Sequence, residues 1–306
     1  KKKIYFGTNT KMYKTIKDTV EFVSQLQELT KDISREDMQL FVIPSYTTLR
    51  DANEAKDEDL LMVGAQNMGW EEQGQFTGEI SPLMLQEVGT DIVMIGHSER
   101  RHVLGETDEE ENKKVLCALN HNFTTLLCVG ETGEQKDYGI SEEVIRIQLK
   151  KGLYGVTKEQ TEKLWIAYEP VWAIGVNGKP ATKEYAEQIH IVIRETLVEL
   201  FGEEAGNEIP VLYGGSVNPE NAVGLSKMEH IDGLFIGSSA WQADNFNKII
   251  IGKKGAMIKE IGTQARVEME NLLDMKVNLR LWVKVRKDWR DSDILLKNYG
   301  YNKKEL

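Results

Sequence analysis

Three ionisable side chains, Lys11, His97 and Glu169, each stand at the C-terminal end of a short apolar run. A carboxylate and an imidazole can accept and donate protons, and an ammonium group can stabilise a negative charge that develops during a reaction. Taken alone, a glutamate is more often a surface residue in a salt bridge, and a histidine more often has a structural role. They indicate proton-transfer chemistry only if the fold brings them together.

The elements that would bring them together recur along the first 240 residues. The apolar runs are nearly continuous rather than alternating, which is typical of strands buried on both faces of a parallel sheet. Amphipathic segments such as 18–29 and 185–200 separate most of them and predict helices. The runs are IYFGTN (4–9), LFVIPSY (40–46), LLMVGAQN (60–67), IVMIGHS (92–98), TLLCVGE (125–131), LWIAYEP (164–170), PVLYGGS (210–216) and GLFIGSS (233–239).

Eight strands that alternate with helices over about 250 residues predict a (β/α)₈ barrel. A doubly wound open sheet is the alternative, but no GxGxxG motif follows the first run. In a barrel the C-terminal ends of all strands meet at one rim, where such folds place their active sites. The polar and glycine residues at these ends are Asn9, Lys11, His97, Ser98, Glu131, Glu169, Gly214, Gly215, Ser216 and Gly237.

Composition divides the chain into an acidic body and a basic end. The net charge is −11, yet residues 250–306 hold 13 Lys and Arg against 8 Asp and Glu. No run of 18 apolar residues predicts a membrane span, and the N-terminal residues have no apolar signal core. Cys117 and Cys128 match neither a zinc pattern nor a CxxC motif, so we expect a cytoplasmic protein with two free thiols.

Five motifs at the predicted rim resemble those of the triosephosphate isomerase family, over residues 4–249. They are NTK (9–11), GHSERR (96–101), CVGE (128–131), YEPVWAIG (168–175) and YGGSV (213–217). The resemblance implies a TIM-barrel isomerase domain in residues 1–249. It also implies a homodimer that uses no metal or cofactor and interconverts two small phosphosugars, glyceraldehyde 3-phosphate and dihydroxyacetone phosphate, through an enediolate.

The resemblance assigns roles to the catalytic residues. Glu169 is the base, and closure of a loop over it would raise its basicity by excluding water. His97 is expected as a neutral imidazole whose protonation a helix N-terminus suppresses, a tuning for which this family is the usual worked example. Lys11 supplies positive charge, Asn9 holds Lys11 and the substrate, and Glu99 tethers Lys11.

Further residues match the parts of the family that bind phosphate, close over the substrate and join the subunits. Thr77, in the loop 66–79, is expected near Asn9 and Lys11 of the partner subunit, although a long polar surface loop is the alternative. Backbone N–H groups would bind phosphate at Gly175, Ser216, Gly237 and Ser238. The lid hinge and its latch are Pro170, Val171, Trp172 and Tyr213.

The sequence departs from the family pattern at three places. Thr10 replaces the usual tryptophan, Ser238 replaces a glycine, and the segment 176–182 is one residue longer than usual. The catalytic residues are kept while the lid tip and the phosphate collar change. A longer lid would accommodate a longer sugar, so an isomerase of phosphorylated tetruloses such as erythrulose phosphate is the alternative.

Residues 250–306 resemble a second family, the C-terminal KH domain of the GTPase Era. The resemblance is carried by Gly252-Lys253-Lys254-Gly255, the predicted helix 256–273 and the segment 277–290. It implies an α+β type II KH segment whose Gly-x-x-Gly loop would bind RNA, with Lys253 and Lys254 on phosphates. The segment is incomplete, because the barrel's last helix occupies the place of the strands and helix that should precede the loop.

Overall fold

The protein is described by a computed structural model, which covers residues 3–175, 178–252, 256–257 and 270. The chain divides into two compact units, residues 1–257 and residues 258–306. Nearly all of the second unit lies outside the described residues, so the predicted KH helix and strand are not described either.

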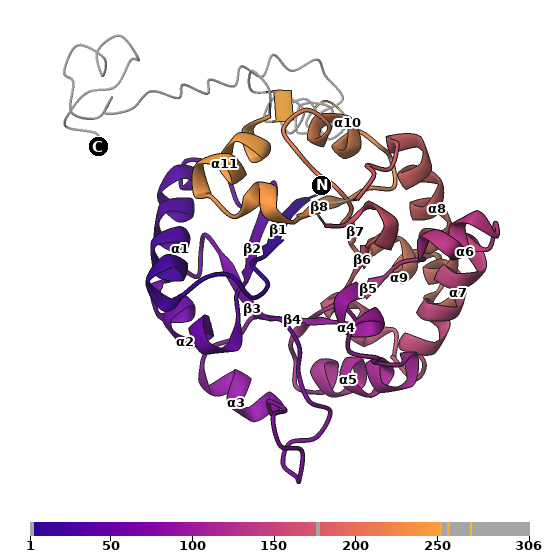
Figure 1. The fold of residues 1–306 in the computed structure, drawn as a ribbon, viewed down its shortest axis with the longest axis horizontal. Helices are drawn as coiled ribbons and strands as arrows, with labels where there is room; N and C mark the ends of the chain where they lie inside the picture. Colours follow the sequence, from indigo (N-terminus) through magenta and orange to yellow (C-terminus); the bar gives the residue numbers. More distant parts are fainter. Residues whose placement is uncertain (1–2, 176–177, 253–255, 258–269, 271–306) are drawn as a thin grey trace. The chain divides into compact units, whose positions relative to one another are not determined.

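The first unit is a closed barrel in which each strand pairs in parallel with the next and β8 pairs with β1 (Figure 1). The prediction of a (β/α)₈ barrel is therefore confirmed, and each apolar run overlaps one strand. The strands among the described residues are β1 (Ile4–Asn9), β2 (Met38–Ile43), β3 (Met62–Ala65), β4 (Ile92–Ile95), β5 (Thr124–Val129), β6 (Leu164–Tyr168), β7 (Val211–Tyr213) and β8 (Gly233–Ile236).

The barrel interior is filled by apolar side chains, which explains why the strands read as continuous apolar runs. Phe41 lies at its centre, with its ring centroid 5.6 Å from that of Trp165 and 5.7 Å from that of Phe235. Gly7 of β1 faces the Phe41 ring, and a Cβ atom at Gly7 would overlap it. The sequence therefore needs a glycine in β1 to admit a phenylalanine from β2.

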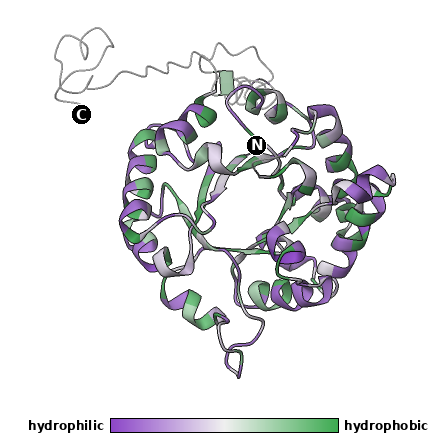
Figure 2. Ribbon diagram, in the orientation of Figure 1, coloured by the Kyte–Doolittle hydropathy of each residue, from purple (hydrophilic) through white to green (hydrophobic). Residues whose placement is uncertain are grey.

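Helices surround the barrel and turn their apolar sides inward, as the colouring by hydropathy shows (Figure 2). α11 packs beside α1 and so closes the ring between the last and the first helix (Figure 1). The helices among the described residues are α1 (Ile16–Thr30), α2 (Tyr46–Ala55), α3 (Pro82–Glu87), α4 (Ser98–His102), α5 (Asp108–Asn120), α6 (Gly133–Asp137), α7 (Ser141–Gly152), α8 (Lys183–Phe201), α9 (Glu203–Glu208), α10 (Ala222–Ser226) and α11 (Ala243–Ile251), with 3₁₀ turns η1 (Glu159–Lys163), η2 (Val171–Ala173) and η3 (Ser238–Ala240).

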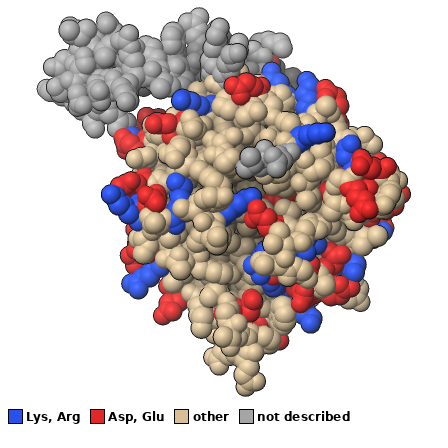
Figure 3. All heavy atoms as spheres, in the orientation of Figure 1, with Lys and Arg blue, Asp and Glu red and all other residues tan. Residues whose placement is uncertain are grey.

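The surface of the described unit carries charges of both signs. On the face shown in Figure 3, Lys and Arg side chains alternate with Asp and Glu rather than forming a patch of one sign. In the described part of the chain, no helix is both long enough and apolar enough to span a bilayer.

Candidate active site

Lys11 is held in an unusual backbone conformation at the end of β1. Its φ of +51° lies in the left-handed region, which costs a residue with a side chain about 1 kcal/mol. The Lys11 N–H donates to Oδ1 of Asn9 at 2.8 Å, and its carbonyl accepts from Gln66 Nε2 and Ser45 Oγ, both at 2.8 Å. These bonds fix the turn that directs the lysine side chain, whose Nζ lies 2.5 Å from Oε1 of Glu99.

Gln66 and Ser45 are positioning residues that the sequence analysis did not single out. Gln66 directly follows β3 and Ser45 lies two residues after β2, at the same rim as the other strand-end residues. Gln66 also donates to Oδ1 of Asn9 at 3.1 Å, so one amide holds both Asn9 and Lys11. Only their positions after predicted strands could have indicated them in the sequence, because neither side chain is ionisable.

His97 follows the end of β4 and forms the N-terminal cap of α4. Its Nδ1 accepts a hydrogen bond of 3.2 Å from the backbone N–H of Glu99, and its Nε2 lies 3.1 Å from Oε1 of Glu169. An Nδ1 that accepts from a backbone amide places the ring hydrogen on Nε2. The Nε2–H group therefore faces the Glu169 carboxylate.

Glu169 directly follows β6 and is buried, with 3% of its surface exposed. Its Oε2 accepts a hydrogen bond of 3.1 Å from the backbone N–H of Ser98. A glycine directly follows each of the two neighbouring strands, β5 and β7. A Cβ atom at Gly130 would overlap the Glu169 carbonyl oxygen, and one at Gly214 would lie 3.0 Å from the Glu169 Cγ. Gly130 thus makes room for the backbone of Glu169, and Gly214 makes room for its side chain.

Burial and mutual contact act in opposite directions on this pair. Burial raises the pKa of Glu169, but His97, the Ser98 N–H and Lys11 together outweigh it and hold that pKa below its ordinary value. Burial lowers the pKa of His97, but the adjacent carboxylates of Glu169 and Glu99 outweigh it and raise that pKa. For His97 this direction is opposite to the prediction from the sequence, which rested on the helix N-terminus and not on direct contact with carboxylates. For Glu169 the prediction was a rise in pKa on closure of the loop over it, and the contacts with His97, Ser98 and Lys11 act against that rise.

A second buried carboxylate, Glu131, anchors the segment that follows Glu169. It accepts hydrogen bonds from Tyr168 Oη at 3.0 Å, Trp172 Nε1 at 2.9 Å and Tyr185 Oη at 2.8 Å. Trp172 belongs to the turn η2, and its ring also contacts the ammonium group of Lys136, 4.9 Å from the ring centroid. Glu131 therefore holds the start of the predicted lid, whose residues 176–177 lie outside the described residues.

The remaining predicted residues lie in the segments that follow β6, β7 and β8. Gly175 has a φ of +82°, and Ser216 is half-buried with its carbonyl accepting from Asn221 Nδ2 at 2.9 Å. Gly237 and Ser238 are exposed at the start of η3. A Cβ atom at Gly215 would overlap the Tyr213 hydroxyl and lie 3.1 Å from Pro170, so the predicted latch and hinge lie beside this glycine.

Two groups of predicted residues lie apart from this cluster in the described chain. Thr77 is exposed in the loop between β3 and α3, which projects beyond the ring of helices (Figure 1). Gly252, with a φ of +74°, ends helix α11, and its N–H donates to the Lys248 carbonyl at 2.9 Å. The other residues predicted to bind RNA, Lys253, Lys254 and Gly255, lie outside the described residues.

The geometry defines a class of protein. A parallel (β/α)₈ barrel whose strand ends bring a carboxylate, an imidazole and a paired ammonium group together is suited to moving a proton on a small bound molecule. Comparison with known proteins narrows that class.

Residues 4–253 match the family model described as triosephosphate isomerase, and residues 244–290 match that of the KH domain. A triosephosphate isomerase from Carboxydothermus hydrogenoformans is 45% identical over 251 residues, which cover 82% of this chain and 99% of that protein. An L-erythrulose-1-phosphate isomerase from Rhizobium etli is 43% identical over 267 residues, covering 87% and 98%. The chain belongs to the triosephosphate isomerase family.

Proposed function

We propose that the protein interconverts glyceraldehyde 3-phosphate and dihydroxyacetone phosphate by proton transfer through an enediolate. The observation that carries the proposal is the contact of 3.1 Å between Nε2 of His97 and Oε1 of Glu169, beside the Lys11–Glu99 pair. Relatives named triosephosphate isomerase at 42–45% identity support the choice of a triose.

Each side chain has one task in this mechanism. Glu169 takes the proton from the carbon next to the substrate carbonyl and returns it to the neighbouring carbon. The Nε2–H of His97 donates to the carbonyl oxygen as that oxygen becomes negative, and the Lys11 ammonium stabilises the same charge. Because Glu169 and His97 touch each other, the substrate must enter between them, so the carboxylate turns away from His97 when the sugar binds.

The phosphate group would lie at the ends of β6, β7 and β8. Backbone N–H groups of Gly175, Ser216, Gly237 and Ser238 would donate to it, and the glycines allow a close approach of the backbone. Pro170, Val171 and Trp172 would act as the hinge of a lid that excludes water, with Tyr213 as its latch.

A second subunit would complete the site. Thr77 projects on its loop and would reach Asn9 and Lys11 of the partner subunit. The exposed apolar side chains of Met12, Tyr13 and Phe76 support this proposal, with 93%, 70% and 44% of their surface accessible in the single chain. An isologous contact between two such loops would bury them.

A tetrulose phosphate is the second candidate substrate. It is favoured by the segment 176–182, one residue longer than the family pattern, by Ser238, and by the similarity to the L-erythrulose-1-phosphate isomerase. Turnover measured on both triose phosphates and on both erythrulose phosphates decides between them. The triose proposal expects a higher kcat/KM on glyceraldehyde 3-phosphate, and a thousandfold preference for the four-carbon sugar would overturn it.

RNA binding is a candidate of a different class, and it is favoured only by the KH match over residues 244–290. Lys253 and Lys254 would contact phosphates there, so binding should weaken as salt rises. Filter binding of the full chain to ribosomal RNA is compared with the double variant Lys253→Glu, Lys254→Glu. Equal or absent binding by both proteins would reject this function without affecting the isomerase proposal.

A further inference from the structure

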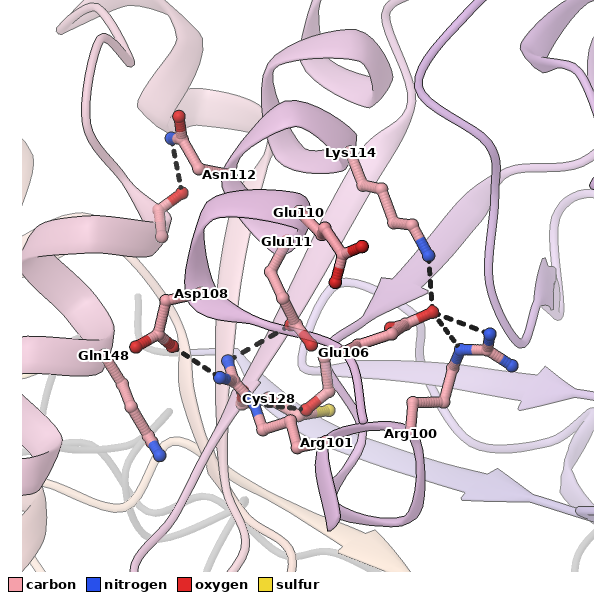
Figure 4. A network of polar contacts seen from close by, with 12 residues as sticks. Arg100, Arg101, Glu106, Asp108, Glu110, Glu111, Asn112, Lys114, Cys128 and Gln148 are labelled. Carbon is pink, nitrogen blue, oxygen red and sulfur yellow. Dashed lines mark hydrogen bonds and ion pairs between the residues drawn. The ribbon is translucent and has the colours of Figure 1, made fainter. Parts of the chain in front are cut away.

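Arg101 connects the ends of two barrel strands beside the catalytic residues. Its Nε donates to the carbonyl of Gly96 at 2.8 Å. Its Nη2 donates to the carbonyl of Cys128 at 2.9 Å (Figure 4). Gly96 directly follows β4 and directly precedes His97, whereas Cys128 belongs to β5. The guanidinium group therefore fixes the backbone from which His97 projects.

Two carboxylates from the start of α5 hold this guanidinium group in place (Figure 4). Asp108 accepts from Nη1 at 2.6 Å, and Oε2 of Glu111 lies 3.1 Å from Nη2. Glu111 is fully buried, and among the described residues neither of its oxygens has a hydrogen bond of good geometry. Its charge is therefore balanced mainly by the ion pair with Arg101.

Glu111 also packs directly against the backbone of the residue before His97. Gly96 has a φ of +75°, and a Cβ atom there would overlap Oε2 of Glu111 and lie 2.9 Å from Nη2 of Arg101. The carboxylate fills the space that a side chain at position 96 would need. A change at Glu111 is thus transmitted to His97 both through Arg101 and through this contact.

We propose that Glu111 is a positioning residue for His97. In its ionised form it shares Arg101 with Asp108, and the guanidinium group then holds the ends of β4 and β5 so that the backbone from which the imidazole projects stays in place. The expected effect on turnover rests on the isomerase function proposed above. The expected effect on the position of His97 does not depend on that function.

The charge state of Glu111 changes near neutral pH. Burial raises its pKa to about 7; Glu106 and Asp108 act in the same direction, while Arg101 and Lys114 oppose it. The Cys128 thiol also faces this cluster and stays neutral, because burial and the nearby carboxylates raise its pKa. Glu111 is therefore protonated at pH 5.5 and ionised at pH 8.5.

The first test compares Glu111→Gln with the wild type and with the control Glu109→Gln. The control removes an exposed carboxylate of the same helix turn, which lies 2.7 Å from Lys151. At pH 8.5 we expect kcat of Glu111→Gln to be about tenfold lower with KM unchanged, because a small displacement of a catalytic group is costly. At pH 5.5, where the wild-type carboxyl is also neutral, we expect the two rates to converge, and the control should follow the wild type throughout.

The second test reads the position of His97 without substrate. The imidazole resonances of ¹³C-histidine-labelled protein, assigned with His97→Gln, are followed from pH 5.5 to 8.5. We expect the His97 signal of Glu111→Gln to differ from the wild type above pH 7 and to coincide with it below. Coincident His97 signals at all pH values, or a kcat ratio that does not vary with pH, would overturn the proposal. A wild type inactive on both sugars would reject the proposed isomerase function, while the resonances would still decide the role of Glu111.

Discussion

Single residues in this protein are tuned by the contacts they make, and Lys11 shows this for the backbone. Its left-handed conformation is unfavourable by itself, and it is held by Asn9, Gln66 and Ser45. The ammonium group is thereby directed to Glu99 before any substrate binds. Such preorganisation means that little has to move when a negative charge develops on a bound molecule.

The single residue Glu111 also predicts how the free energy of unfolding changes with pH. Its pKa is raised from 4.5 to about 7 in the folded protein, so its ionised form is disfavoured by folding. The wild type should therefore lose stability relative to Glu111→Gln as pH rises from about 4.5 to about 7, by roughly 3 kcal/mol in total. Denaturant unfolding of both proteins at pH 5 and pH 8 measures the difference, and a difference that is the same at both values contradicts the assignment.

This stability effect runs opposite to the proposed effect on turnover. Above pH 7, Glu111→Gln should be the more stable protein and the less active one. A residue that served only the fold would move both quantities in the same direction. The combination therefore separates a positioning role from a structural one.

At the scale of elements, helix α11 shows how the barrel ends and the KH match begins. The two family matches overlap on residues 244–253, and the helix that lies there packs in the barrel beside α1. Gly252, the first glycine of the predicted Gly-x-x-Gly loop, ends this helix in a left-handed conformation. Gly252 therefore has a structural role as the C-terminal cap of α11, and this role does not depend on RNA.

Gly252→Ala and Gly202→Ala form a matched pair that tests this role. Both glycines end a helix with positive φ, at +74° and +84°, so alanine should cost each about 1 kcal/mol. A Cβ atom at Gly252 would also lie 2.7 Å from the Met257 nitrogen, whereas one at Gly202 would have no atom of the described residues within 4 Å. We expect the larger loss of unfolding free energy for Gly252→Ala, and equal losses in denaturant unfolding would contradict the packing of Gly252 on Met257.

At the scale of the whole molecule, the sequence predicts the barrel well because its strands are buried on both faces. Continuous apolar runs followed by polar residues mark both the strands and the catalytic rim. The segment DEEENKK in α5 gives no such signal, although Glu111 and Lys114 within it are fully buried or nearly so. Glu111 is buried against Arg101, and Lys114 is buried against Asn67. Both partners lie outside α5, so the spacing of apolar residues within the helix cannot reveal this burial.

The proposed homodimer is also a property of the whole molecule. Thr77→Arg would place a charge where the loop is expected to enter the partner subunit, and charges are depleted in the buried core of such interfaces. We expect sedimentation to give a dimer for the wild type and a monomer with reduced activity for the variant. Glu58→Arg, an exposed change elsewhere on the unit, serves as the control. A monomeric wild type with full activity would reject the need for a partner.

The most direct test of the central claim follows the proton itself. The protein is incubated with dihydroxyacetone phosphate in D₂O, and ¹H NMR measures deuterium incorporation at the carbon next to the carbonyl. If Glu169 is the base, the wild type should catalyse incorporation, and Glu169→Gln should slow it by about 10³-fold while Glu58→Gln does not. Incorporation by Glu169→Gln at the wild-type rate would contradict the account.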